Sequence, residues 1–471
     1  MSKTHAFPTV RQLVDQTADS RDRVIDLVRG LALCAVVAGH ALMAEVAFIN
    51  GHAILSNTLV QTPWLQWLTW VLQIMPLFFA AGAYVNVRSY SSGKETYSRW
   101  LSARVRRLLR PAIPYVLFWI VISPLLLWWN TAIALPLLRI STQLLWFLGA
   151  YLLTVALTPV FMLGAKHPIY STSAWLLGVA AVDIIRLSGG PSAIGLLNFC
   201  FGWAVAAQCG LWLFDSTKRP RTAVAIIGAV VCFGVNVTLV SVGPWPRSMV
   251  GLPGERISNM APPSLVLGLH AITLAFLVAA IYPLLVRLTL RPRVWFATVA
   301  VNSSAMTLYL WHLVALITSV LVVYLTGHNL VSYETPRWWV PRLIFWGTFI
   351  VLTVVLVRLL RPLEFMKLPW WDSAPVIRAD ATPRWRGFMS IAGVIITSVG
   401  ILELSVTGLV GFPFNSGINY AGFRFTPGIA LIVILGGLIL IRAAAADGDD
   451  PPSWQRNLGH PHTEHPTPSA E

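Results

Sequence analysis

The stretch that decides the fold is the first long apolar run, VIDLVRGLALCAVVAGHALMAEVAF at residues 24–48. A helix needs about 20 mainly apolar residues to cross a bilayer, and this run supplies them. It also contains Asp26, Arg29 and His40, although ionisable side chains are costly in hydrocarbon and usually mark function there. Read as a helix, the run places Arg29 and His40 on one face, about 16 Å apart along the axis, with Asp26 one turn from Arg29.

The composition places the rest of the chain in a membrane as well. Hydrophobic residues make up 56% of the 471 residues and charged residues only 11%. That is too little polar surface to cover a soluble globule of this size, so we predict an all-α, polytopic helical bundle. The twelve segments predicted to be spans are residues 24–48, 64–87, 112–130, 142–164, 172–187, 193–214, 222–242, 262–286, 300–325, 339–357, 389–411 and 426–441.

The basic residues are distributed unevenly over the connections between these segments. If the N-terminus is cytoplasmic, 27 of the 34 lysines and arginines fall at the inner side and the remaining 7 at the outer side. This asymmetry predicts that both termini are cytoplasmic, in a multi-pass protein of a cell's inner, or plasma, membrane. It also accounts for the net charge of +15, because inner connections face anionic lipids, so no nucleic-acid partner is expected.

The spans and connections suggest five regions. Residues 1–22 are predicted to be a cytoplasmic tail, and residues 23–362 a membrane domain. Residues 363–388 are predicted to be a cytoplasmic linker at the interface, because their prolines interrupt helices and their tryptophans favour the head-group layer. Residues 389–442 hold two additional transmembrane helices. The polar, proline-rich residues 443–471 are predicted to be a disordered cytoplasmic tail.

The first inner connection contains a cationic helix face. In SARVRRLLRP, Arg104, Arg107 and Arg110 recur at intervals of three before Pro111. Such spacing places the three guanidinium groups on neighbouring positions of one face, and arginine is well suited to phosphate because its planar fork donates two parallel hydrogen bonds. The alternative is positive charge that only sets the topology and needs no particular spacing.

Further polar residues lie within the predicted spans. Trp146 begins a WFL element, and Ser303, Tyr309 and His312 belong to the stretch NSSAMTLYLWH. Tyr309 and His312 are three residues apart and therefore share a helical face. A second histidine in a span favours a polar cavity between helices, whereas a single histidine is also compatible with a hydrogen-bonded packing residue.

The features described so far are compatible with two function classes that are not enzymes. The first is a proton-coupled secondary transporter or lipid exporter, which twelve spans with buried ionisable groups would suit. Such proteins often contain two similar halves, and no such internal similarity is visible in this sequence. The second is a membrane scaffold, in which replacing His40 would change no catalytic activity.

Five motifs in order resemble the acyltransferase type 3 family of membrane proteins. They are an arginine followed after ten residues by histidine (Arg29, His40), PLFF before a small-Gly-small segment (76–83), RxxRP (107–111), WFL (146–148) and SxxxTLYLWH (303–312). The resemblance runs from about residue 22 to residue 362. One departure is Ala81-Gly82-Ala83, where relatives often have Ser-Gly-Phe, and it concerns substrate specificity more than reaction class.

The resemblance implies an O-acyltransferase with ten core helices in residues 23–362. In this family the acyl group, commonly acetyl, comes from cytoplasmic acyl-CoA and is transferred to a hydroxyl of a cell-envelope glycan or glycolipid. The donor is a substrate, and neither a permanently bound cofactor nor a metal is expected. The histidine that matches His40 is essential in the family, and the arginines that match Arg29, Arg107 and Arg110 are functionally important.

The chemistry of the side chains, taken together with this resemblance, predicts a role for each candidate residue. An alcohol is a poor nucleophile at neutral pH, so we predict that His40 is the general base that takes its proton. Arg29, Arg104, Arg107 and Arg110 are the candidates for binding the acyl-CoA head, and the pantetheine arm is expected to reach His40 along the first helix. The supporting residues have smaller predicted roles: Asp26 holds Arg29, Tyr309 and His312 donate to the oxyanion or orient the acceptor, and Trp146 and Ser303 belong to the family motifs.

Overall fold

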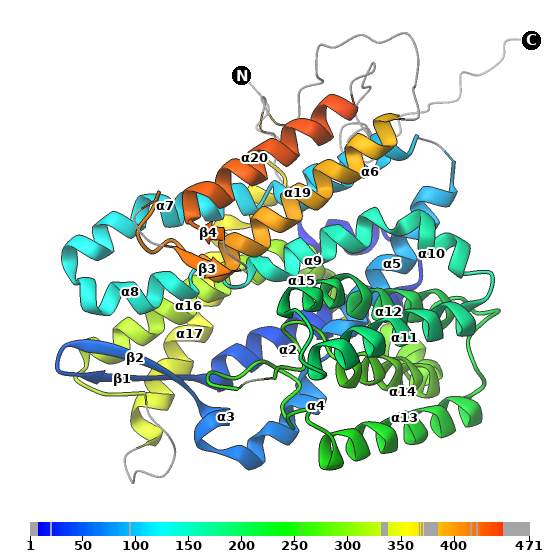
Figure 1. The fold of residues 1–471 in the computed structure, drawn as a ribbon, viewed down its shortest axis with the longest axis horizontal. Helices are drawn as coiled ribbons and strands as arrows, with labels where there is room; N and C mark the ends of the chain where they lie inside the picture. Colours follow the sequence, from blue (N-terminus) through cyan, green and yellow to red (C-terminus); the bar gives the residue numbers. More distant parts are fainter. Residues whose placement is uncertain are drawn as a thin grey trace, which may run out of the picture.

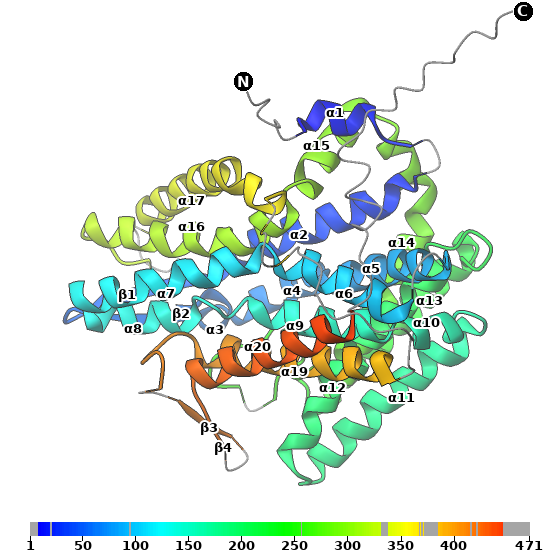
Figure 2. The same cartoon turned by 90° about the horizontal axis from the view of Figure 1, so that it is seen from above.

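The computed structural model describes residues 8–18, 21–93, 96–255, 257–330, 338–366, 368, 371, 385–414, 417–420 and 423–445. It is an all-α bundle with two short β-hairpins (Figures 1 and 2). Within the described residues, twelve helical segments are long and apolar enough to cross a membrane, and each of the twelve predicted segments overlaps one of them. The C-terminal tail predicted at 443–471 lies almost wholly outside the described residues.

The long helices are interrupted by short helical connections. The first half contains α1 (Val10–Asp15), α2 (Arg23–Met43), α3 (Thr58–Gln61), η1 (Pro63–Leu68), α4 (Thr69–Leu72), α5 (Met75–Ser91), α6 (Tyr97–Leu109), α7 (Ala112–Trp129), α8 (Thr131–Ile140), α9 (Leu145–Ala156), α10 (Thr158–Gly164) and α11 (Pro168–Leu187). The second half contains η2 (Ser192–Leu196), α12 (Leu197–Leu213), α13 (Thr222–Val242), α14 (Leu265–Thr289), α15 (Pro292–Asn302), α16 (Ala305–Leu325), α17 (Trp339–Leu360), η3 (Arg361–Glu364), α19 (Trp385–Thr407) and α20 (Pro427–Ala444).

The first span is shorter than its apolar run. α2 ends at Met43, and residues 44–48 of the predicted span instead belong to strand β1 (Ala44–Ile49), which pairs antiparallel with β2 (His52–Asn57). The two strands are joined by Asn50 and Gly51, whose φ angles of 50° and 78° are the left-handed values that a two-residue type I′ turn requires. Asn-Gly is the strongest short sequence signal for such a turn. The sequence therefore indicates this hairpin, although the apolar run alone predicted a continuous helix.

The two ends of the bundle differ, and we name them by their contents. The hairpin end contains β1–β2, α3, η1 and the 243–264 connection between α13 and α14. At this end Val46 pairs with Leu330, and Trp70 donates to the Arg247 carbonyl. The basic end contains the start of α2, with α6 and α15. The β1–β2 hairpin lies at the left of both views, away from α1 and α15 (Figure 2).

The N-terminal tail predicted at 1–22 contains a short helix. Thr9 caps α1 through a capping box with Gln12, and α1 packs against α15 at the basic end. Next to it, the Asn302 side chain donates to the Asp26 carbonyl, which ties α15 to α2. The described residues of the tail, 8–18 and 21–22, therefore belong to the basic end.

The two additional helices, α19 and α20, form a close hairpin across the bundle (Figure 1). Gly400 and Gly437 allow this approach, because a Cβ at either position would lie within 3 Å of backbone atoms of the facing helix. α19 also packs on α9, and just before α9 the Thr142 hydroxyl donates to the Leu404 carbonyl at 2.8 Å. α19 thus covers the element that contains the WFL motif. Most of the predicted 363–388 linker lies outside the described residues.

Candidate active site

His40 and His312 contact one another in the middle of the bundle. The Nδ1 atom of His40 lies 3.0 Å from Nε2 of His312, and the two rings are stacked with centroids 5.3 Å apart. His312 is fully buried, whereas His40 is half-buried. The two histidines singled out in the sequence, 272 residues apart, therefore form one pair between α2 and α16.

The hydrogen bonds assign the protons of this pair. Nδ1 of His312 lies 3.0 Å from the Leu308 carbonyl, and because a carbonyl can only accept, this nitrogen carries the proton. A neutral His312 then has its lone pair on Nε2, so Nδ1–H of His40 donates to it. In neutral His40 the remaining nitrogen, Nε2, carries a lone pair. No described residue forms a hydrogen bond with that nitrogen, which leaves it able to accept a proton.

His40 lines a cavity of about 220 Å³ that lies toward the hairpin end. Its wall is mainly apolar and comes from α2, α3, η1, α4, α9 and α17, with single residues from α5 and α16. Polar or aromatic side chains are contributed by Thr58, Thr69, Gln73, Trp146, Tyr309, Trp338, Arg342 and Trp346. Enclosed apolar walls with a few convergent polar groups are typical of small-molecule sites.

The 243–264 connection covers part of this cavity. Val250 and Met260 belong to its lining. The connection is bound to α4, because the Met249 amide donates to the Thr69 hydroxyl at 2.9 Å and the Gln73 amide group lies 3.0 Å from the Met260 sulfur. The cavity therefore has a defined cover at the hairpin end.

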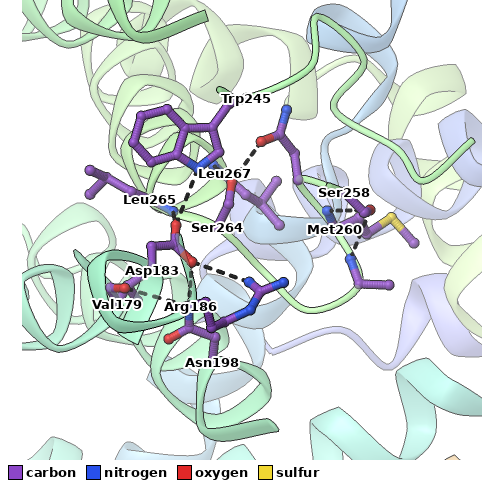
Figure 3. A network of polar contacts seen from close by, with 12 residues as sticks. Val179, Asp183, Arg186, Asn198, Trp245, Ser258, Met260, Ser264, Leu265 and Leu267 are labelled. Atoms are coloured by element: carbon purple, nitrogen blue, oxygen red, sulfur yellow. Dashed lines mark hydrogen bonds and ion pairs between the residues drawn. The ribbon is translucent and has the colours of Figure 1, made fainter. Parts of the chain in front are cut away.

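A buried carboxylate fixes both ends of that cover (Figure 3). Asp183, near the end of α11, accepts from the Trp245 indole at 3.3 Å and from the Leu265 amide at 2.8 Å. Its other oxygen accepts from Asn198 and Arg186. Trp245 lies near the start of the 243–264 connection and Leu265 directly follows it, so Asp183 joins the two ends of the cover.

The arginines predicted to bind the donor gather at the basic end. The Arg29 guanidinium lies over the Phe78 ring, 5.3 Å from its centroid, and Arg104 lies over Trp100. Desolvation, followed by the charges of Arg104 and Arg29, lowers the pKa of Arg107 to about 10, although part of this side chain is exposed. At neutral pH all these groups are cationic, so they form one field that favours an anion.

Arg110 and Ser303 complete this end. Arg110 is buried, with 4% of its surface exposed, at the end of α6. Ser303 lies in the turn between α15 and α16 and donates to the Ala300 carbonyl, so it does not join the cavity that His40 lines. The start of α16 is capped by Glu364, which accepts from the Thr307 amide and lies within electrostatic range of Arg107.

A second hollow lies at the basic end on the opposite side of α2 and α5. It has a volume of about 840 Å³, is open, and is lined by both charged and apolar side chains. Its charged lining residues are Arg21, Asp22, Arg23, Arg88, Asp215, Lys218 and Arg219. Several are already engaged in the protein, as in the 3.2 Å ion pair between Lys218 and Asp215.

Asp26 has a different partner from the one predicted. Its carboxylate pairs with Arg21, at 2.6 Å from Nε and 3.1 Å from Nη2, and not with Arg29. The predicted role of Asp26 in holding Arg29 was wrong, because the chain before α2 folds back and presents Arg21 to the same face. Arg29 instead keeps a buried Nε atom for which no described residue provides a hydrogen-bond acceptor.

Tyr309 and Trp146 both line the cavity, in contact with aromatic neighbours. The Tyr309 hydroxyl donates to the Leu144 carbonyl, so in this structure its single proton is not available for the predicted contact with an oxyanion. Trp146 stacks on Trp203, at 5.6 Å between ring centroids. Both residues therefore shape the wall of the cavity.

An aromatic layer separates the cavity from Arg29. Phe78, which lies under Arg29, contacts Phe147 at 5.2 Å between centroids, and Phe147 contacts Tyr309 at the same distance. Phe147 and Tyr309 line the cavity, but Phe78 and Arg29 do not. These rings thus lie between Arg29 and the cavity, along the route predicted for the pantetheine arm.

The glycine of the small-Gly-small segment has a packing role in this layer. A Cβ on Gly82 would lie 2.3 Å from the Tyr151 hydroxyl oxygen, so only glycine lets α5 approach α9 here. The motif in the sequence therefore reports a close contact between two helices that position the aromatic rings. Pro76 of the same motif stands in the first turn of α5, after the break that follows α4, and does not kink the helix from within.

Sequence reasoning missed a group of cavity residues at the hairpin end. Arg342 is 1% exposed and pairs with Glu45 at 3.4 Å, and Thr58 lies beside both. Arg342 was counted only as an outer-side charge, and Glu45 was placed within the first span. An arginine and a glutamate that both flank apolar segments were the available signal.

Comparisons with known proteins identify the family of the chain. A family model described as an acyltransferase domain matches residues 22–358, the part of the chain that contains α2 to α17 and every motif discussed above. No curated protein and no solved structure gave a match. With more than half of the chain matched, the protein belongs to the acyltransferase type 3 family of integral-membrane O-acyltransferases.

Proposed function

We propose that the protein transfers an acetyl group from cytoplasmic acetyl-CoA to a hydroxyl of a cell-envelope glycan or glycolipid, in a bacterial inner membrane. The observation that carries this proposal is the His40–His312 pair beside a mainly apolar cavity, with Arg29 about three helical turns away on α2 and the other arginines of the basic end on α6. The pair supplies a base, the cavity a place for the reacting groups, and the arginines a site for an anionic donor.

His40 acts as the general base in the proposed reaction. Its Nε2 atom takes the proton of the acceptor hydroxyl while that oxygen attacks the thioester carbonyl. The tetrahedral intermediate then expels the CoA thiolate, which receives the proton from His40 and leaves as the thiol. The new ester bond replaces the thioester bond, so no oxidant, metal or further reactant is needed.

His312 serves as a positioning residue in this reaction. By accepting from Nδ1–H of His40, it holds the tautomer whose Nε2 lone pair is free, and it favours the imidazolium that forms when His40 takes a proton. The role is comparable to that of the third member of a catalytic triad. It differs from the predicted role of His312 as a donor to the oxyanion.

The donor and the acceptor approach from opposite ends. The phosphates of acetyl-CoA bind near Arg29, Arg107 and Arg110, and the acyl arm passes between α2 and α9, where the rings of Phe78 and Phe147 must move aside. The acceptor enters at the hairpin end, next to the 243–264 cover. Under the charge asymmetry of the connections, the basic end faces the cytoplasm.

The test is acetyl transfer by the purified full-length protein in lipid nanodiscs. Radiolabelled acetyl-CoA is incubated with envelope lipids and glycans from a strain that lacks the gene, and labelled products are identified by mass spectrometry. We expect an acetyl increment of one acceptor class with the wild type and none with His40→Ala. A protein that moves solutes across liposomes without acyl-CoA, and labels nothing, would instead be the transporter.

A further inference from the structure

An ion pair is buried beside the cavity at its hairpin end. Arg342 lines the cavity, and its guanidinium contacts the Ala44 carbonyl at 2.7 Å, Glu45 at 3.4 Å and the Thr58 hydroxyl at 3.4 Å. Glu45 stands behind Arg342 and is itself only 3% exposed. The pair joins the β1–β2 hairpin to α17, at the opposite end of α2 from Arg29.

Stability alone does not explain this pair. Burying two charges costs desolvation free energy that their attraction roughly repays, so apolar residues of similar volume usually serve a core as well or better. Intramembrane ionisable groups accordingly mark functional sites. Arg342 also retains a buried Nε atom with no hydrogen-bond partner among the described residues, so its donors are not all used within the protein.

The charges at this end of the cavity determine whether it favours a charged or a neutral ligand. Glu45 neutralises Arg342, and Thr58 adds a hydroxyl without charge. An anionic ligand would bring its charge close to the Glu45 carboxylate, whereas a neutral hydroxyl would accept from Arg342 and donate to Thr58 without repulsion. This part of the cavity therefore favours neutral, hydroxyl-rich groups.

The shape and the aromatic wall indicate a single ring. The volume of about 220 Å³ is below the range of about 300–1,000 Å³ found for drug-sized ligands, so one ring-sized group fits and an oligosaccharide does not. Trp338 and Trp346 offer indole surfaces beside Arg342, with Trp338 5.7 Å from the guanidinium carbon. Flat apolar faces next to a hydrogen-bonding group suit a sugar ring, which has C–H faces and a hydroxyl edge.

From this we infer that the hairpin end of the cavity binds one neutral sugar unit of the acceptor, with Arg342 as a specificity-determining residue that reads its hydroxyls and Glu45 as the residue that positions Arg342. The inference rests on the proposed function, since it names the acceptor class of the same site. An acceptor with a neutral terminal sugar would present one hydroxyl to His40 while its remaining hydroxyls contact Arg342 and Thr58.

Binding of small probes tests the inference without turnover. Full-length His40→Ala protein in nanodiscs is titrated with hexyl β-glucoside, β-galactoside and α-mannoside, with hexyl glucuronide as the anionic probe and 1-hexanol as the ringless probe. We expect at least one neutral glycoside to bind about tenfold or more tightly than both other probes, which is the size of one good hydrogen bond to a charged group. Equal binding of hexanol, or tighter binding of the glucuronide, would overturn the inference.

Variants of the ion pair then test Arg342 itself. Arg342→Lys keeps the charge but removes the planar fork, and the double variant Arg342→Met with Glu45→Leu removes both charges so that neither is left buried alone. Both should lose the preference for the glycoside over hexanol. Arg139→Met changes an exposed arginine of α8 at the same end and should keep it. A purely structural Arg342 would weaken all probes equally and leave the preference intact.

The two proposals fail separately in this design. Loss of acetyl transfer from acetyl-CoA to every envelope acceptor, with glycoside binding intact, would reject the acyltransferase proposal for this chain's substrates. Acetyl transfer that proceeds while no neutral glycoside is preferred would reject only the sugar-binding role of Arg342.

Discussion

α2 contributes His40 to the cavity at the hairpin end and Arg29 to the arginine cluster at the basic end, yet these two regions differ in almost every physical respect. The cavity is small, enclosed and mainly apolar, and its one ion pair is neutral overall. The basic end contains Arg29, Arg104 and Arg107 in mutual electrostatic range, next to a larger open hollow. Under the proposed function, this difference would let the positive charges bind the donor at one end while acyl transfer takes place in the cavity at the other.

The aromatic layer lies between these two regions. Phe78 contacts Arg29 on one side and Phe147 on the other, and Phe147 belongs to the cavity wall. Under the proposed function, these rings would keep the thioester away from His40 until they move aside, which limits the time in which water beside His40 could hydrolyse the donor.

The largest expected effect is at His40. Replacing it with alanine removes the general base, so kcat for acetyl transfer should fall about 10²–10⁴-fold while the affinity for acetyl-CoA, set at the other end, stays unchanged. Steady-state kinetics with equilibrium binding of the donor measures both. His52→Ala, at an exposed histidine of the β1–β2 hairpin, is the matched control. A His40 variant that binds acetyl-CoA poorly would contradict the expectation that the donor is bound by the basic end and not by His40.

His312 should give the next largest effect. Leucine at this position fits a buried apolar site but leaves Nδ1–H of His40 without its acceptor, so the ring loses its fixed tautomer and kcat should fall about a hundredfold with little change in either KM. Glutamine can still accept from His40 and should restore part of the rate. If leucine and glutamine are equally active, the hydrogen bond between the two rings has no role in positioning.

A smaller effect is expected from the arginines of α6. Arg107→Ala and Arg110→Ala should each raise the KM for acetyl-CoA about tenfold, the value of one hydrogen bond to a charged group, with kcat nearly unchanged. Lysine should rescue only if charge rather than fork geometry matters. Because the pKa of Arg107 is lowered only to about 10, this contribution should be constant from pH 6 to about pH 9 and then decline.

The control for these variants is Arg293→Ala, which removes an exposed charge of α15 at the same end. It should change the KM little. If all three variants behave alike, the basic end acts through its total charge and not through the arginines of the RxxRP motif. Variants of Arg88 and Lys218 then show whether the 840 Å³ hollow takes the nucleotide instead.

The sequence predicted the spans well because hydropathy reports burial in lipid directly. Each of the twelve predicted segments overlaps a helical segment that is long and apolar enough to span a membrane. A second histidine in a span predicted a polar cavity between helices, but the direct contact between His40 and His312 was not predicted. The hairpin at 44–57 was missed because residues 44–48 continue the apolar run of the first helix. Only Asn50-Gly51 indicates the turn between its two strands. The local sequence pattern gives the length of an apolar run but not the residue at which its helix ends.

Contacts between distant segments were harder to predict. Asp26 pairs with Arg21 rather than Arg29 because of the path of the chain before α2, which no periodicity encodes. The pair of Arg342 and Glu45 joins residues 297 apart, and each looks like an ordinary flanking charge alone. Such pairs become visible only when the helices are placed side by side, which is also why the sugar-binding inference needed the structure.

The smallest expected effect is also the most selective for the comparison of the two ends. Raising the salt concentration from 0.1 M to 1 M shortens the Debye length from about 10 Å to about 3 Å, which weakens attraction at the exposed arginines but hardly reaches an enclosed cavity. The KM for acetyl-CoA should therefore rise about threefold, whereas the affinity for a neutral hexyl glycoside should stay constant. Salt sensitivity of both would mean that the cavity shares the field of the basic end, and the aromatic layer would then not separate them.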